Sequence, residues 1–394
     1  MSGPSRPIAP YLAAFVALGL ATTVLGPAVG QLRQQTGATV AALAIAFAAQ
    51  SFGYLIASIL AGRRFDADAG HRLLAGGLAA LGLSGFGWAP STSVAAVAGV
   101  AAAVGAAAAV VDVGANTLLV WARPGDPGPA LNALHLCFGL GALAAPALVD
   151  RSIAWTSGLW AVAGVVAVPS IAVAAVLVRR PAPAAPPRPA SGPSAGGLTA
   201  RCGLAAFYVL YIGAELGVAG WIHTYAGAVG FGPAAATGVT ATFWAGFCLG
   251  RLVAAAVVRR VGEIRLLVVS CALAALAAVG LLAGDGTPAA VWVGAGLFGA
   301  TVSPQFPTMI AVADRRLGLT GSITAWIIAG TGLGSLTLPW LIGVLLDRAG
   351  ARAMPATVAV LATASLVWAV VLTARLLPAG DQQPGRQPEG FSPS

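Results

Sequence analysis

Four polar side chains lie inside long apolar runs of this 394-residue sequence, where a polar group is costly to bury and usually serves a function. Asp112 lies in AAAAVVDVGANTLLV, and Asn116 follows one helical turn later on the same face. Glu215 lies near the middle of FYVLYIGAELGVAGWIHTY, and Gln305 lies between two prolines in TVSPQFPTM. A buried carboxylate beside an amide can exchange a proton and bind paired hydroxyl groups. The structural alternatives are a hydrogen bond to another helix or to a buried basic side chain for Asp112, a buried partner bond for Glu215, and a kinked packing helix around Gln305.

Other side chains in apolar runs have two interpretations each. Arg251 lies about two turns from the end of its run, where it could neutralise an acid or extend its charged group to the membrane surface. His135 and Asn132 share a helix face, and a polar packing bond is slightly favoured for both. Trp244 lies two turns before Arg251 on the same face, where it could stack on a bound ring or simply pack.

Several kinds of catalytic site are absent from the sequence. The chain has no lysine, which removes a P-loop lysine and a Schiff-base lysine. Its three histidines form no HExxH motif, and its four cysteines form no CxxC motif. We therefore expect no enzyme activity and no bound metal.

The composition is that of an integral membrane protein. Residues of the AVILMFWYC set make up 58% of the chain, and charged residues make up 8%, against roughly 25% in soluble proteins. So few charges cannot cover a water-exposed surface of this size, so most of the chain must be surrounded by lipid.

Twelve apolar runs are long enough to cross a bilayer, which needs about 20 residues each. With both termini placed inside, sixteen of the 21 arginines fall on the cytoplasmic side, so we expect a multi-pass protein of the plasma (inner) membrane with cytoplasmic termini. The net charge of +9 is then a topology signal, and no nucleic-acid partner is expected. The runs lie at 10–30, 39–61, 73–89, 94–120, 130–149, 157–178, 202–226, 236–258, 264–284, 288–313, 321–346 and 355–377.

The runs divide into two similar halves. GLGALAAP at 139–146 matches GLGSLTLP at 332–339 in five of eight positions, at an offset of 193 residues. We expect a six-helix bundle over 1–178, a proline-rich cytoplasmic linker over 179–201, a second six-helix bundle over 202–377 and a disordered cytoplasmic tail over 378–394. The predicted fold class is all-α: twelve transmembrane helices in two six-helix pseudo-repeats.

Two parallel six-span repeats resemble the major facilitator superfamily of secondary transporters, in which the solute binds between the halves near the membrane midplane. The segment GRRFDADAGHRLL at 62–74 is similar to the superfamily's gating loop between spans two and three, with Gly62, Asp66, Gly70 and Arg72 at the matching positions. It departs from that pattern by one extra residue before Gly70 and by Ala67 in place of a basic residue. The alternative is a cytoplasmic loop whose charges reflect only the positive-inside rule.

Within the superfamily, the chain resembles the fucose–galactose–glucose symporter group and the sodium-dependent glucose transporter-like proteins. The resemblance implies that Asp112 is the proton-coupling acid and that Asn116, Glu215 and Gln305 bind sugar hydroxyls. The first span carries no acid, which leaves the coupling ion as H+ or Na+. The matching segments are DVGAN at 112–116, LNALHLCFGLGALAAP at 131–146, YIGAE at 211–215, FWAGFCLGR at 243–251 and QFPT at 305–308.

The predicted function is therefore proton-coupled symport of a small neutral solute, such as a monosaccharide, by a carrier that works as a monomer in lipid. The alternative is a proton-driven antiporter that exports a drug or metabolite. FGLGALAAPALVD lacks the Gly-Pro pair through which such exporters resemble one another, which lowers this alternative. A non-transporting sensor would need a soluble signalling module, and none is evident in the sequence.

Overall fold

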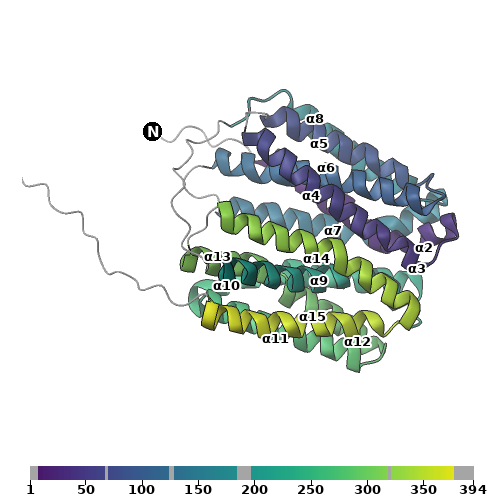
Figure 1. The fold of residues 1–394 in the computed structure, drawn as a ribbon. Helices are drawn as coiled ribbons and strands as arrows, with labels where there is room; N and C mark the ends of the chain where they lie inside the picture. Colours follow the sequence, from purple (N-terminus) through teal and green to yellow (C-terminus); the bar gives the residue numbers. More distant parts are fainter. Residues whose placement is uncertain (1–7, 67–69, 124–127, 184–196, 318–320, 377–394) are drawn as a thin grey trace, which may run out of the picture.

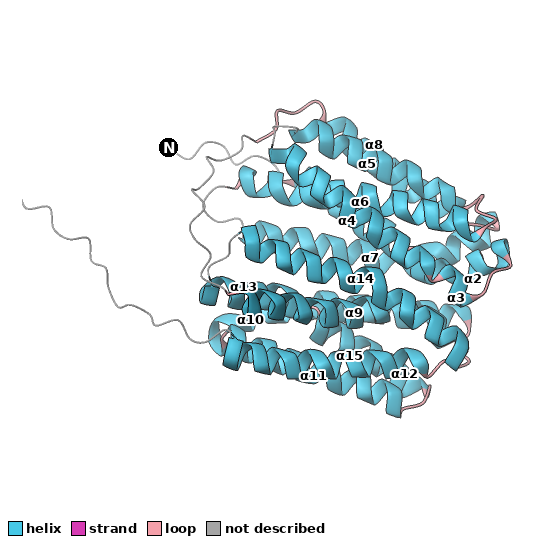
Figure 2. Cartoon of the chain, in the orientation of Figure 1, coloured by secondary structure: helices cyan, strands magenta, loops and turns pink. Residues whose placement is uncertain are grey.

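The computed structural model describes residues 8–66, 70–123, 128–183, 197–317 and 321–376, and within these ranges the regular secondary structure is helical (Figure 2). Helices satisfy every backbone hydrogen bond internally, which lipid requires. The all-α prediction is confirmed. The predicted tail and residues 184–196 of the predicted linker lie outside the described residues.

The first half of the chain is built from nine elements that follow the predicted runs closely. They are α1 (Ala9–Thr23), α2 (Leu25–Thr36), α3 (Val40–Leu43), α4 (Ile45–Asp66), α5 (Gly70–Ser84), the 3-10 helix η1 (Gly85–Trp88), α6 (Val94–Ala122), α7 (Gly128–Thr156) and α8 (Trp160–Leu177).

The second half contains eight elements, of which the last is a single π-helical turn. They are α9 (Leu198–Ala228), α10 (Pro233–Val261), α11 (Glu263–Ala283), α12 (Pro288–Val302), α13 (Gln305–Leu317), α14 (Gly321–Ala349), α15 (Ala353–Val371) and η2 (Leu372–Leu376).

Nine helices in the described ranges are long and apolar enough to cross a membrane, and α1 with α2 forms a tenth candidate bent by 41°. Pro27 explains this bend, because it has no N–H to donate to the carbonyl of Thr23. The other two predicted spans fall on broken helices. One is α5 with η1, and the other is α12 with α13, interrupted at Ser303 and Pro304.

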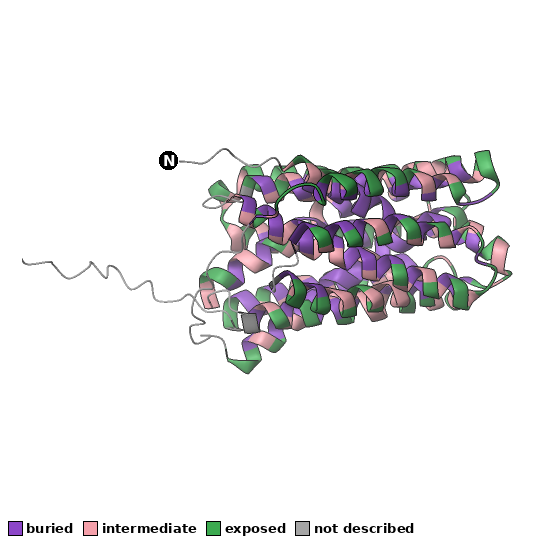
Figure 3. Ribbon diagram, turned by 90° about the horizontal axis from the view of Figure 1, so that it is seen from above, coloured by how far each residue is buried: buried purple, intermediate pink, exposed green. Residues whose placement is uncertain are grey.

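Buried apolar side chains form two clusters, one in each half of the sequence. The first lies between Tyr11 and Leu177, and most of the second lies between Ala200 and Leu372. Buried residues line the inside of the bundle and exposed residues its outside (Figure 3). Leu276 and Val168 are 67% and 71% exposed. Such exposed apolar surface is expected where lipid surrounds the helices.

The halves touch one another along the middle of the bundle and toward one of its ends. We call the end where α1 begins and η2 ends the terminal end, and the opposite end, where α2 and α14 end, the distal end (Figure 1). α4 approaches α14 toward the distal end, and the Ser51 hydroxyl donates to the Ser335 carbonyl at 2.9 Å. Close pairs between the halves are Gly26 with Gly220, Ala44 with Gly343, Leu55 with Gly332, and Gly139 with Cys248.

Within the first half, α4 and α6 pack almost backbone to backbone. A Cβ at Gly105 would lie 1.9 Å from the Gln50 carbonyl oxygen, and a Cβ at Gly53 would lie 2.1 Å from the Ala102 oxygen. Only glycine permits this approach. It brings the residues that follow on both helices within hydrogen-bonding distance of each other.

Candidate functional site

Asp112 of α6 lies at the centre of a hydrogen-bonded group of three side chains. The Asn116 amide donates to Asp112 Oδ1 at 2.8 Å, and the Tyr54 hydroxyl of α4 donates to Oδ2. Asp112 and Asn116 are half-buried, and Tyr54 is 36% exposed. The prediction that Asp112 and Asn116 share a face is confirmed. Their functional roles stay predictions.

Tyr54 was not predicted as a site residue. It is one of several aromatic residues in the second apolar run, and nothing in its local pattern indicates which helix it faces. The glycine contacts between α4 and α6 decide this. One turn earlier, the Gln50 amide donates to the Thr22 carbonyl of α1 at 3.0 Å, which fixes α4 against a second helix of the same half.

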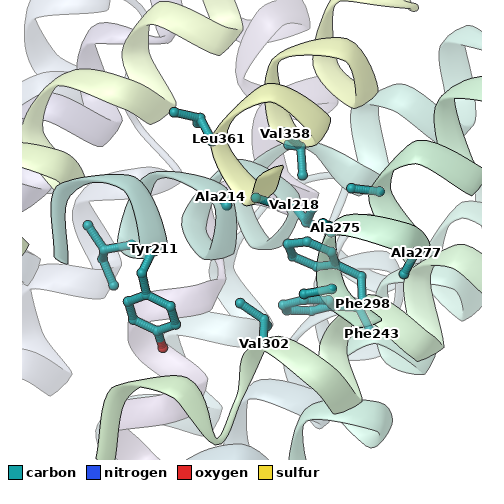
Figure 4. Close-up of a cluster of buried hydrophobic side chains, with 14 of the residues drawn as sticks. Tyr211, Ala214, Val218, Phe243, Ala275, Ala277, Phe298, Val302, Val358 and Leu361 are labelled. Carbon is teal, nitrogen blue, oxygen red and sulfur yellow. The ribbon is translucent and has the colours of Figure 1, made fainter. Parts of the chain in front are cut away.

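In the second half, Glu215 of α9 is 8% exposed and accepts a hydrogen bond from the Tyr211 hydroxyl, one turn earlier on the same helix. The ring of Tyr211 lies beside the apolar core of this half (Figure 4), and it stacks on Phe207 with centroids 6.1 Å apart. Glu215 therefore has a hydrogen-bond donor on its own helix, as the structural interpretation requires. The structure reports no hydrogen bond between this pair and the Asp112 group.

Arg251 of α10 lies near enough to Glu215 to interact with it electrostatically, without forming an ion pair in the described structure. Its guanidinium carbon lies 4.7 Å from the centre of the Phe247 ring, a cation–π arrangement. Arg251 Nε is buried with no hydrogen-bond partner among the described residues. Both interpretations of Arg251 stay predictions.

The remaining predicted residues of α7 and α10 lie at or near the contact between the halves. His135 packs edge-on against Phe15 at 5.5 Å and lies within electrostatic range of Arg251. Asn132 is exposed, and no hydrogen bond is described for its side chain. Trp244 is buried, and its ring meets Phe138 of the other half at 6.1 Å. This is the packing alternative for Trp244, and ring stacking on a solute stays a prediction.

Gln305 does not join the other predicted polar residues. Its amide donates to the carbonyls of Thr301 at 3.2 Å and Ser270 at 3.4 Å, and the side chain is 2% exposed. The Thr308 hydroxyl likewise bonds within the helix, to the Pro304 carbonyl at 2.6 Å. These bonds stabilise the break between α12 and α13 and fit the kinked packing helix. The role of Gln305 in hydroxyl binding is untested.

The predicted gating loop is described only in part. Gly62 is half-buried near the end of α4, Gly70 begins α5 with φ of 43°, and Arg72 is exposed. The side chain of Asp66 lies outside the described residues. His71, which follows Gly70, was not predicted as a site residue.

His71 is buried and connects three parts of the first half at the terminal end. Its Nε2 lies 2.7 Å from the Tyr11 hydroxyl of α1, and its Nδ1 lies 3.0 Å from the Arg180 carbonyl beyond α8. Both partners are neutral groups, a tyrosine hydroxyl and a backbone carbonyl. His71 therefore holds neighbouring helix ends together.

At the distal end, a polar contact joins the halves. Asp150 of α7 accepts a hydrogen bond from the Thr237 hydroxyl of α10. His223 of α9 lies within electrostatic range of Asp150, and its Nε2 is buried without a partner among the described residues. The neighbouring Arg151 turns away, 5.7 Å from the ring centre of Trp155.

The described residues contain no group of three or more potential metal ligands, and their four cysteines are free. A hollow of about 240 Å³ between α11 and α12 is lined by side chains such as Leu276 and Leu297, which are mostly exposed on the outside of the bundle. Such an apolar surface suits lipid chains. The polar chemistry of the chain therefore lies in the Asp112 group, in the Glu215–Arg251 group and in the contacts between the halves.

Comparison with known proteins gives this chemistry a family context. Residues 11–329 match the sequence profile of the Major Facilitator Superfamily. The chain is 27% identical over 379 residues to Sodium-dependent glucose transporter 1A of Mus musculus, covering 84% of this chain and 88% of that protein.

Solved structures of similar fold include a D-xylose-proton symporter, with a TM-score of 0.74, 12% identity and coverage of 94% of this chain and 97% of that one. Another is a bacterial homologue of the human lysosomal transporter Spinster in an inward-facing, occupied conformation. Its TM-score is 0.69 at 14% identity, with 95% of this chain and 96% of that chain covered. At these identities the likeness concerns the fold.

Proposed function

Because this chain belongs to the Major Facilitator Superfamily and is a membrane transporter, we propose that it carries a monosaccharide in symport with protons, by alternating access. The observation that carries the proposal is the Asp112 group: a half-buried carboxylate held by two donors in the middle of a membrane-spanning helix. The relatives named as glucose transporters support a sugar as the solute. They do not favour the export of drugs.

In the proposed mechanism, Asp112 binds the coupling proton. An ionised carboxylate is costly to bury beside a bound solute, so the solute-loaded carrier reorients only when Asp112 is protonated. After solute and proton are released, the empty carrier returns with Asp112 ionised and hydrogen-bonded to its two donors. Asn116 holds one carboxylate oxygen and keeps the acid in a fixed rotamer. The coupling cation is a proton in this proposal, and Na+ is the other candidate because the named relatives depend on it.

The sugar is proposed to bind between the halves, with hydroxyls at Asn116 and Glu215. Arg251 balances the charge of Glu215, which allows that carboxylate to accept hydrogen bonds from a neutral solute without itself exchanging the coupling proton. Gln305 is retained as a candidate hydroxyl ligand only if α13 reorganises, because its amide is engaged by backbone carbonyls.

The close pairs between the halves favour a carrier that is closed at its distal end. We propose that this end faces outside, so that the terminal end and both termini face the cytoplasm, as the arginine distribution predicts. The plasma membrane is the proposed location. A monomer supplies both halves of the site.

The test is uptake of a panel of labelled hexoses into proteoliposomes, with an inward proton gradient, an inward sodium gradient or no gradient. Proton-stimulated uptake of one hexose is expected. Asp112→Asn should abolish the stimulation and leave gradient-independent exchange, because the amide cannot carry the proton. Asp285→Asn is the matched control, because Asp285 is 60% exposed and pairs with Arg352 outside the spans.

Two results would contradict the proposal. If folded protein takes up no hexose, the assignment of a sugar as the solute is wrong. If a sodium gradient alone drives uptake and Asp112→Asn does not affect it, then proton coupling and the role assigned to Asp112 are wrong.

A further inference from the structure

We propose that Tyr54 is a proton-controlled ligand of the solute: it donates to Asp112 when that acid is ionised, and to the solute when Asp112 carries a proton. The inference rests on the proposed function, in which Asp112 binds the coupling proton. It goes further by assigning a second residue, on a different helix, to the step that links the proton to the solute.

The argument begins with the two partners of Asp112. The Asn116 amide donates to Oδ1 at 2.8 Å, and the Tyr54 hydroxyl donates to Oδ2. An ionised carboxylate only accepts hydrogen bonds, and both of these groups satisfy it. In this arrangement, each oxygen of the ionised Asp112 carboxylate has a hydrogen-bond donor.

Protonation changes what Asp112 needs. One oxygen becomes an O–H donor and must find an acceptor. The amide nitrogen of Asn116 cannot accept a hydrogen bond, whereas the Tyr54 hydroxyl can. The proton is therefore accommodated on Oδ2, and the bond reverses from Tyr54 Oη–H···Oδ2 to Oδ2–H···Oη without any other bond being made or broken.

The reversal releases the hydroxyl hydrogen of Tyr54, which then needs an acceptor of its own. Tyr54 is 36% exposed, so its ring is not enclosed by its own half. Its neighbours on α4, Ser51 and Leu55, contact Ser335 and Gly332 of α14 in the other half. In the proposal, this acceptor is an oxygen of a solute that binds between α4 and the second half, because sugar hydroxyls can accept hydrogen bonds.

Other titratable groups on the helices packed around α6 do not take this role in the described structure. His71 of α5 bonds to Tyr11 of α1 and to the Arg180 carbonyl, and His135 of α7 packs on Phe15. Asp150, with Arg151 beside it, lies at the distal end of α7. The remaining titratable side chains of these helices are four arginines at helix ends and one half-buried thiol. They are Arg63 and Arg64 at the terminal end of α4, Arg72 at the start of α5, Arg33 at the distal end of α2, and Cys137 in α7.

The test compares wild type with Tyr54→Phe, which removes the hydroxyl and keeps the ring. The first readout is the KM of hexose exchange as a function of pH in proteoliposomes. In wild type, KM should fall on acidification, because protonation frees the Tyr54 donor. In Tyr54→Phe, KM at acid pH should be roughly 3- to 10-fold higher than in wild type and should no longer depend on pH.

The second readout needs no solute. The infrared absorption of the protonated Asp112 carboxyl, identified as the band lost in Asp112→Asn, is followed against pH in purified protein. Tyr54→Phe removes a donor that favours the ionised form, so the midpoint should move to higher pH by about one unit. Tyr208→Phe is the matched control, because its hydroxyl donates to the Phe306 carbonyl at 3.0 Å and touches no acid.

The outcomes separate the two proposals. A wild-type pH dependence of KM in Tyr54→Phe, or an unchanged midpoint of the Asp112 band, overturns the role of Tyr54. Absence of hexose transport by folded wild type overturns the proposed function and the solute part of this inference, and the infrared midpoint then decides the Tyr54–Asp112 part alone. Thermal unfolding of each variant shows that the comparison is made on folded protein.

Discussion

Replacing Thr237 by valine should weaken the closure of the distal end. The Thr237 hydroxyl of α10 donates to Asp150 of α7, so this bond connects the two halves. Valine keeps the shape of the side chain but leaves the carboxylate without its donor while the distal end is closed. When the halves separate, water can solvate Asp150, so the penalty applies to the closed state alone.

The size of the effect follows from the type of bond. Hydrogen bonds to charged groups contribute about 1.5–3 kcal/mol, and each 1.4 kcal/mol changes an equilibrium tenfold. The ratio of distally open to distally closed molecules should therefore rise by about 10- to 150-fold. Asp150→Asn should have a smaller effect, because the amide oxygen can still accept from Thr237.

The assay is a distance distribution between spin labels at Gln34 and Arg348, measured by pulsed electron paramagnetic resonance. Both residues are exposed at the distal end, on α2 and α14 in different halves. The labels are attached to cysteines in a background lacking the four native ones, because Cys202 is exposed. Thr237→Val should increase the population with longer distances.

Thr242→Val is the control for this experiment. Its hydroxyl donates to the Gly238 carbonyl within the same helix, so it lacks a bond to the other half. If Thr237→Val and Thr242→Val give the same distribution as wild type, the distal contact does not hold the halves together and the reasoning is wrong.

Two further predictions concern stability. Gly105→Ala should lower the melting temperature in detergent by several degrees or prevent folding, because the new Cβ would lie 1.9 Å from the Gln50 oxygen. Gly99→Ala on the same helix is the control. Its Cβ meets no atom within 4 Å, so this variant should be neutral or slightly stabilising. Equal melting temperatures for the two variants would refute the close α4–α6 packing. Glu263→Gln removes the partner of Arg315, which is 71% exposed, and should change the free energy of unfolding by less than about 1 kcal/mol. A larger loss in chemical denaturation would show that this surface pair is part of a wider network.

The sequence alone determined the properties that depend on composition or on neighbours along one helix. The apolar runs predicted the membrane helices, because lipid requires long apolar segments with internal hydrogen bonds. The four-residue spacing predicted that Asp112 and Asn116 would share a face, and their side chains are hydrogen-bonded in the structure. Pro27 and Pro304 accompany the breaks in the first and tenth predicted spans.

Only the tertiary structure decided which helices meet. Tyr54 and Asp112 are 58 positions apart, and Asp150 and Thr237 are 87 apart, so no local pattern connects them. The sequence predicted Gln305 as a hydroxyl ligand or as part of a kinked packing helix, and only the folded chain shows that its amide bonds to backbone carbonyls of its own half. In a membrane bundle, helices are apolar on every side, so hydrophobic periodicity cannot distinguish the face toward lipid from the faces toward other helices. Glycine contacts such as that of Gly105 with Gln50 make that choice, and they exist only in the folded chain.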